Sequence, residues 1–353
     1  MKKINDYKYD DYYNDMNRNL DKILYRYITH EIKLNIEDYN FLSKEHINKE
    51  YIINRIKELK NNRYILNKLK NIPYIEQRSL EWFELRKKSL TASDLFEAIT
   101  KNNKLLAKKK AGVYIDNINF NNIAATKWGN MFEDMAIRCY SQLNNNIKIN
   151  DFGLINNKNI ENFAASPDGI TDLGIMVEIK CPYTRVIKKD IIPLKYYYQV
   201  QGQLAVCELK ECDYVECKFV TINNYEEYKK YIIDNNLDRK NHGIIAEYFN
   251  KKDDKFEYLY SNSYLNYEET IVDINKKKIE KNNDIEFIKQ TYWYLDNIYI
   301  QRIEFDKELW KTIPDKINSF WNLVIESKKL PIEYKIEKKK IYKFVEDTDN
   351  QDE

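Results

Sequence analysis

The clearest pattern in the chain is an alternation of apolar and polar residues on either side of a turn signal. The turn signal occupies residues 172–174, and Thr171 is expected to pair with Ile175 across it. Successive side chains of a strand point to opposite faces, so Ile175, Val177 and Ile179 should face a core. The pattern therefore predicts a β-hairpin with one buried face.

The second face of this hairpin carries polar residues. The same register places Asp168 opposite Glu178 and Ser166 opposite Lys180, so all four side chains share one face. Pro167 has no N–H for a ladder and predicts a bulge or a strand end there, which leaves a one-residue slip in the register open. A hairpin with a solvated, charged face is the plain alternative.

Other segments have helical or strand periodicity. Thr91-Ala92-Ser93-Asp94 is typical of a capping box, so a second helix is expected to start there and to offer open N–H groups to an anion. The helix over 127–143 should bury one stripe and place Glu133 at its edge. The predicted elements are helices over 79–87, 127–143, 194–207 and 317–324, strands over 214–222 and 299–305, and a hairpin of strands 243–249 and 256–260.

Changes in composition divide the chain into four parts. Residues 1–75 are polar and lean towards helix, and they form a predicted helical appendage. Residues 76–235 form the predicted core domain, and residues 236–335 form an α+β extension packed on it. The acidic tail over 336–353 is expected to be disordered.

Composition removes several classes of function. The chain has 353 residues and a formal net charge of +2, so nucleic-acid binding cannot be argued from global charge. Five cysteines without a CxxC pair argue against a disulfide framework, and three scattered histidines argue against a zinc site. No apolar run is long enough to cross a membrane, and the start lacks an apolar signal core, so we expect an intracellular protein. Among the basic runs, Lys108–Lys110 is the best candidate for contact with DNA.

Two facing carboxylates are the strongest chemical signal. Asp168 and Glu178 would repel each other across a ladder unless a divalent cation lay between them. Lys180 is close enough in sequence to orient or deprotonate a water held by that cation. On the helix over 194–207, Gln199 and Gln203 share a face and Gln201 lies roughly opposite.

Four segments together resemble one family of nucleases. EWFELRKKSLTAS, GNMFEDMA, ASPDG…VEIKCP and YYYQVQGQLAV have the order and approximate spacing found in lambda-exonuclease-like nucleases, also called YqaJ-type viral recombinases, of the PD-(D/E)xK superfamily. The resemblance covers roughly residues 76–222, and the end of the chain is similar to members from large DNA viruses. Leu90 stands where the family commonly has Ile. The resemblance implies an α/β fold with a restriction-endonuclease-like core, in which helices flank a mixed central sheet.

The resemblance also implies a metal site that uses Mg²⁺ or Mn²⁺. Asp168 and Glu178, with the backbone carbonyl of Ile179, are similar to the ligands of the principal metal ion. Glu133 is similar to an additional helix carboxylate that reaches this site, directly or through water. Lys180 is similar to the residue that activates or positions the nucleophilic water. These oxygen ligands suit Mg²⁺ or Mn²⁺, which retain waters for reaction.

A second group of residues is implied to hold the DNA end. Gln199 matches a glutamine on the helix behind the catalytic site. Arg86, Thr91, Ser93 and Ser166 match positions that hold the terminal 5′-phosphate in the family. An arginine can grip a phosphate with two hydrogen bonds.

The leading hypothesis is a Mg²⁺-dependent 5′→3′ exonuclease on linear double-stranded DNA. It would leave 3′ single strands for a single-strand annealing protein or another recombination partner, and it would act as a monomer or a homo-oligomer in a virus-infected cell or a virion. An endonuclease or structure-specific nuclease on the same core is one alternative. A catalytically silent DNA-binding scaffold is the other.

Overall fold

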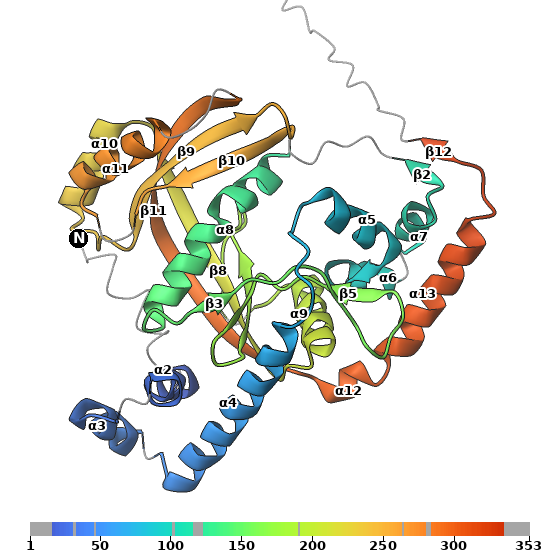
Figure 1. Cartoon of the computed structure of the whole chain (residues 1–353), viewed down its shortest axis with the longest axis horizontal. Helices are drawn as coiled ribbons and strands as arrows, with labels where there is room; N and C mark the ends of the chain where they lie inside the picture. Colours follow the sequence, from blue (N-terminus) through green and yellow to red (C-terminus); the bar gives the residue numbers. More distant parts are fainter. Residues whose placement is uncertain are drawn as a thin grey trace, which may run out of the picture.

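The fold is seen in a computed structural model that describes residues 16–30, 33–45, 47–100, 103–115, 123–189, 191–262, 265–279 and 284–334. A curved sheet runs through the middle of the molecule, and helices cover both of its faces (Figure 1). The tail over 336–353 lies outside the described residues. In the described part of the chain, no helix has the length and apolar character needed to cross a membrane.

The N-terminal region is helical, as predicted. It contains α2 (Met16–His30), α3 (Ile36–Lys44) and α4 (Lys49–Leu69), and these lie together at one end of the molecule (Figure 1). The side chains of Asn35 and Asn48 cap α3 and α4 by accepting backbone hydrogen bonds from Asp38 and Tyr51.

The central sheet is mixed and has seven strands. Its order is β10-β9-β11-β8-β7-β6-β3, and only the β7–β8 pair is parallel. The predicted mixed α/β fold class is therefore confirmed. The strands are β3 (Ile149–Asn150), β6 (Gly169–Thr171), β7 (Met176–Lys180), β8 (Glu211–Ile222), β9 (His242–Asn250), β10 (Lys255–Tyr260) and β11 (Ile285–Glu304).

The predicted hairpin is formed by β6 and β7, in the predicted register. Gly169 pairs with Val177 and Ile170 with Met176, and the Thr171 N–H donates to the carbonyl of Ile175 at 2.8 Å. β6 begins directly after Pro167 and Asp168, so Pro167 lies just before the strand and the predicted register is kept.

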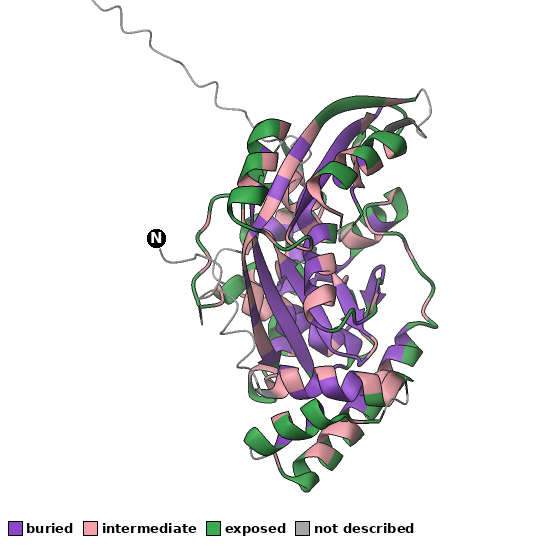
Figure 2. Cartoon of the chain, turned by 90° about the vertical axis from the view of Figure 1, so that its left-hand side faces the viewer, coloured by how far each residue is buried: buried purple, intermediate pink, exposed green. Residues whose placement is uncertain are grey.

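Two helices cover opposite faces of this part of the sheet. The helix α8 (Ala124–Leu143) buries the predicted stripe, including Phe132 and Met135, in one apolar cluster with Val177 and Ile179. The helix α9 (Leu194–Cys207) has the predicted bounds, and its Val200 packs in another cluster on the opposite face. Figure 2 shows the resulting core, in which the strands between these helices are buried. The β6–β7 hairpin therefore lies in the core, between two packed helices.

Smaller elements surround this core. The predicted capping box is wrong: Thr91 makes no side-chain cap bond, and a single 3-10 turn, η1 (Ala92–Asp94), leads into the four-residue helix α6. Ser79 caps α5 as predicted. The remaining elements are α5 (Leu80–Lys88), β1 (Leu90–Thr91), α6 (Leu95–Ala98), α7 (Lys104–Lys110), β2 (Tyr114–Ile115), β4 (Ile155–Asn156), β5 (Phe163–Ala165), α10 (Tyr225–Asp234), α11 (Tyr267–Ile279), α12 (Lys307–Trp310), α13 (Ile313–Ser327) and β12 (Glu333–Tyr334).

The strand predicted over 299–305 is much longer in the structure. β11 has 20 residues, and it pairs with β9 through its first half and with β8 through its second half. A bulge between Leu295 and Asn297 bends it inside the β8 ladder. The same sheet therefore contains strands from both sides of residue 235, where the core domain was expected to end. The division of the chain into domains stays a prediction.

Candidate active site

The two predicted metal carboxylates lie at the open end of the β6–β7 hairpin. Asp168 directly precedes β6, and its Oδ2 accepts a hydrogen bond from the Ile179 N–H at 2.7 Å. Glu178 is in the middle of β7 and has no solvent exposure. The negative charge of Glu178 raises the pKa of Asp168, so the hairpin brings the two carboxylates into electrostatic contact.

Three side chains donate to the Glu178 carboxylate. Gln199 reaches Oε1 at 2.6 Å, Gln203 reaches Oε2 at 2.7 Å, and the Lys180 ammonium forms an ion pair with Oε1. Gln201, on the other side of α9, instead bonds the backbone at Glu304 and Asp306. The helical spacing argument is thus confirmed for all three glutamines.

Gln203 is a site residue that the sequence interpretation did not select. Its side chain is buried, and its Nε2 also lies 3.5 Å from the carbonyl oxygen of Ser166. Its Oε1 has no hydrogen-bond partner in the described part of the chain. The signal that could have found it is its position four residues after Gln199, which places both amides on one helix face.

Glu133 is placed on α8 at the edge of the same site. Its carboxylate pairs with Arg78 at 2.7 Å, and the charge of Glu133 raises the pKa of Asp168. Arg78 was not foreseen from the sequence. It has a positive φ of 67° in the turn that precedes α5, so its role depends on a loop conformation that sequence patterns do not specify.

Burial and like charge perturb the acid groups of the site. Burial, and then the negative charges of Glu178 and Glu133, hold the pKa of Asp168 well above its ordinary value. Burial also raises the pKa of Glu133, against the opposing charge of Arg78. The charges of Glu178 and Asp168 outweigh burial at Lys180 and raise the pKa of its ammonium. A divalent cation, in addition to the Lys180 ammonium, would relieve the repulsion between the carboxylates of Asp168, Glu178 and Glu133.

The donor set fits a hard divalent cation by its chemistry. Asp168 offers half-buried carboxylate oxygens and Glu178 buried ones, and Ile179 and Glu133 are the further expected oxygen donors. In the part of the chain that the structure describes, no three His, Cys, Asp or Glu side chains are arranged as a ready metal cluster. Lys180 instead neutralises the carboxylate of Glu178.

The expected phosphate-binding residues form a connected group beside the carboxylates. An Arg86 Nη lies 3.2 Å from the Ser93 Oγ, which is 3.0 Å from the Thr91 Oγ1. The Arg86 guanidinium stacks 4.3 Å from the centre of the Trp82 ring, and the Trp82 Nε1–H donates to the Ser166 Oγ at 3.0 Å. Trp82 is itself buried. All four predicted residues therefore meet, with Trp82 as the connection to Ser166.

The basic run on α7 is used differently from the expectation. Lys110 turns inward and donates to the carbonyl oxygens of Arg86 and Ser89 at 2.9 Å and 2.8 Å, and it pairs with Asp94 at 3.3 Å. Lys108 pairs with Glu333. Lys110 thus ties the end of α5 to η1 and holds the Arg86 group in place, and contact of Lys108–Lys110 with DNA stays a prediction.

An open cleft reaches the metal side of this site. It has a volume of about 490 Å³ and runs between α8, the end of β7 and the start of α9. Its lining includes Glu133, Lys180, Tyr183, Arg185 and Tyr196. Glu133 and Lys180 are therefore reached from this cleft.

Comparisons with known proteins define the class of this domain. Residues 81–210 match the profile of the YqaJ-like viral recombinase domain, which covers the hairpin, α8 and α9. The match spans less than half of the chain, and it agrees with the resemblance drawn from the sequence motifs.

A viral relative extends the match beyond this domain. The chain is 28% identical over 306 residues to the uncharacterized protein R354 of Acanthamoeba polyphaga mimivirus. The match covers 72% of this chain and 54% of the relative, so the chain spans about half the length of that protein.

Solved structures of two exonucleases are also similar. One is the alkaline exonuclease LHK-Exo from Laribacter hongkongensis, with a TM-score of 0.44, 20% identity, and coverage of 71% of this chain and 95% of that one. The other is a phage related exonuclease from Haemophilus somnus 129PT, with a TM-score of 0.40, 13% identity, and coverage of 67% and 94%.

Proposed function

We propose that the protein is a divalent-metal-dependent exonuclease that degrades linear double-stranded DNA from 5′ ends in DNA recombination. The observation that carries the proposal is the β6–β7 hairpin. It places Asp168, the buried Glu178 and Lys180 beside the Arg86 group, within the region that matches the YqaJ-like domain.

Each residue has a role that its contacts support. Asp168, Glu178, the Ile179 carbonyl and Glu133 would hold Mg²⁺ or Mn²⁺, which when bound polarises the scissile phosphate and lowers the pKa of a water. Lys180, as an ammonium, would orient the attacking water by donating a hydrogen bond to it from Nζ. Gln199 holds the Glu178 carboxylate in place through its 2.6 Å hydrogen bond.

The direction of cleavage would follow from the Arg86 group. Arg86 is stacked on Trp82 and linked to Ser93, so its guanidinium is oriented before DNA arrives. Two charge-assisted hydrogen bonds from Arg86 to a terminal 5′-phosphate, aided by Thr91, Ser93 and Ser166, would hold the DNA end. The next phosphodiester would then lie at the metal. The annealing partner and a homo-oligomeric state stay predictions.

The first test is digestion of duplex DNA in Mg²⁺. The linear substrate carries a 5′-phosphate on one strand and labels at both 3′ ends, and a covalently closed circle in the same tube is the control. We expect loss of the phosphorylated strand from its 5′ end while the circle stays intact. Cutting of the circle would instead indicate an endonuclease, and binding without any cutting would indicate a silent scaffold.

The variant Lys180→Ala tests the proposed chemistry. We expect cleavage to fall by about 10²-fold or more, since the group that orients the water is lost, while DNA binding is retained. Lys188→Ala, at an exposed lysine outside the hairpin, is the matched control and should cleave normally. Cleavage by Lys180→Ala at the rate of the control would contradict the mechanism.

A further inference from the structure

The helix α4 packs against the turn of the catalytic hairpin, although α4 lies outside the region that matches the YqaJ-like domain. Gly174 in this turn has a φ of +75°, and a Cβ there would lie 2.5 Å from the backbone carbonyl atoms of Asn62. The Lys70 ammonium, at the end of α4, also lies 3.6 Å from the Asp172 carboxylate in the same turn. The hairpin is thus in direct contact with the N-terminal helices at its closed end.

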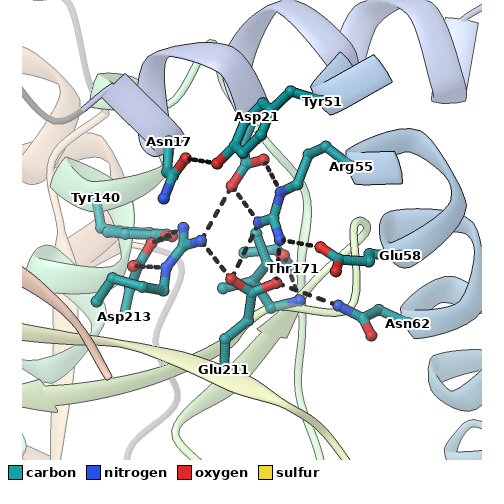
Figure 3. Close-up of polar contacts among 12 residues, drawn as sticks. Asn17, Asp21, Tyr51, Arg55, Glu58, Asn62, Tyr140, Thr171, Glu211 and Asp213 are labelled. Carbon is teal, nitrogen blue, oxygen red and sulfur yellow. Dashed lines mark hydrogen bonds and ion pairs between the residues drawn. The ribbon is translucent and has the colours of Figure 1, made fainter. Parts of the chain in front are cut away.

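A buried ion network fixes the N-terminal helices to the sheet (Figure 3). Arg55 of α4 bonds both carboxylate oxygens of Asp21 on α2 at 2.8 Å, and it reaches Glu211 at the start of β8. Arg302 of β11 bonds Asp213 at 2.6 Å, Glu211 at 2.6 Å and Asp21 at 3.0 Å. The side chains of all five residues are at most 10% exposed. The network therefore connects two helices and two strands away from bulk solvent.

Asn62 joins the network to the hairpin turn. Its backbone touches Gly174, and its Nδ2 lies 3.3 Å from the Glu211 carboxylate. Its buried Oδ1 has no hydrogen-bond partner among the residues that the structure describes, and an unsatisfied buried oxygen lowers stability. β8, which begins at Glu211, is the strand that pairs with β7 and places Tyr214 beside Glu178.

We propose that α2 and α4 form a clamp that positions the catalytic hairpin, with Asn62 and Arg55 as its positioning residues. This inference rests on the proposed nuclease function. The β6–β7 hairpin holds two carboxylates that repel each other at its open end, and β6 has only three residues to resist that repulsion. The clamp restrains the turn of the hairpin and the neighbouring strand β8. It thereby keeps a fixed distance between the carboxylates of Asp168 and Glu178.

The test compares two neighbouring asparagines of α4. Asn62→Ala removes the buried contact with Glu211, and Asn61→Ala makes the same change at an exposed position of the same helix. For both full-length variants, kcat and KM for linear DNA are measured in Mg²⁺ well below the melting temperature. Amide hydrogen exchange of the 168–180 segment is measured without DNA, and the 313–327 segment of α13 serves as an internal reference.

The clamp predicts a specific set of changes in Asn62→Ala. We expect kcat to fall by roughly tenfold with little change in KM, since a small displacement of catalytic groups weakens catalysis more than binding. Exchange should become faster at 168–180 and stay unchanged at 313–327. A lower melting temperature with unchanged kcat and unchanged exchange at 168–180 would overturn the clamp. A wild-type protein without nuclease activity would refute the proposed function, and the exchange comparison would still decide the clamp.

A pair of glycines gives a second, independent variant. Gly174→Ala adds a Cβ against the Asn62 backbone, whereas Gly112→Ala adds one at a similar φ of +74° with nothing within 4 Å. Both substitutions place alanine at a similar positive φ and so carry similar backbone strain. The difference in kcat and in exchange between the two variants therefore measures the effect of the contact with α4. The clamp predicts that only Gly174→Ala raises exchange at 168–180 and lowers kcat, and equal behaviour of the two variants would contradict it.

Discussion

Replacing Arg302 by methionine should be among the most destabilising single changes in the chain. Arg302 makes ion pairs with Asp213, Glu211 and Asp21, and all four side chains are at most 10% exposed. Methionine has a similar length and keeps the apolar packing but cannot donate a hydrogen bond. The variant would leave Asp21 and Glu211 paired with Arg55, whereas Asp213 would keep the Tyr140 hydroxyl, a neutral donor at 2.6 Å.

The magnitude follows from the burial of these charges. Removing one partner of a buried ion pair costs about 3–5 kcal/mol, because the charge that remains is neither solvated nor paired. Domains are stable by only about 5–15 kcal/mol, so the change would remove a large fraction of the total. Arg239→Met makes the same substitution at an exposed arginine and should cost less than about 0.5 kcal/mol.

Equilibrium unfolding in urea, followed by circular dichroism and tryptophan fluorescence, measures both variants. Coincident transitions from the two probes would support a two-state treatment of the free energies. We expect the midpoint of Arg302→Met to lie well below that of the wild type and of Arg239→Met. A free-energy loss below about 1 kcal/mol for Arg302→Met would refute the reasoning that the network is buried and tightly coupled.

Two further predictions concern single hydrogen bonds. Gln203→Met removes a donor to the buried Glu178 carboxylate, and a hydrogen bond to a charged group contributes about 1.5–3 kcal/mol. We therefore expect kcat to be at least about tenfold lower, with unchanged affinity for DNA. A normal kcat would contradict the role of Gln203. Burial lowers the pKa of His242 to about 4, while its Nδ1 lies 2.7 Å from the Tyr228 hydroxyl. The folded state favours the neutral His242 ring, whereas the unfolded state binds a proton at the ordinary pKa of 6.5. The contribution of the neutral ring to the free energy of unfolding is therefore complete above pH 6.5 and is lost as the pH falls from 6.5 towards 4. His242→Gln should flatten the melting-temperature profile in that window, and an unchanged profile would refute this assignment.

Local patterns predicted the β6–β7 hairpin and the helix α9 well. Alternation and a turn signal were enough to specify the β6–β7 register, because a shift by one residue would expose Val177 and bury Lys180. Helical spacing was enough to separate Gln199 and Gln203 from Gln201. These are short-range relations, which the periods of strands and helices determine.

Long-range relations could not be predicted in the same way. The pairing of β11 with both β8 and β9 depends on contacts between distant segments, and only its last part was expected as a strand. The role of Arg78 depends on a left-handed backbone conformation, which a sequence favours only weakly at arginine. The inward turn of Lys110 depends on carbonyl groups left open at the end of α5, so a run of lysines gave no hint of it.

The position of β11 in the sheet has a consequence for the order of events during synthesis. β8 pairs with β7 on one side and with β11 on the other, and β11 is not complete until Glu304 has left the ribosome. Until then β8 has an open edge, and Asp213 and Glu211 lack the partner that Arg302 supplies. A nascent chain that already contains the whole hairpin would therefore lack a finished sheet, so the proposed activity would appear only after residue 304 has left the ribosome.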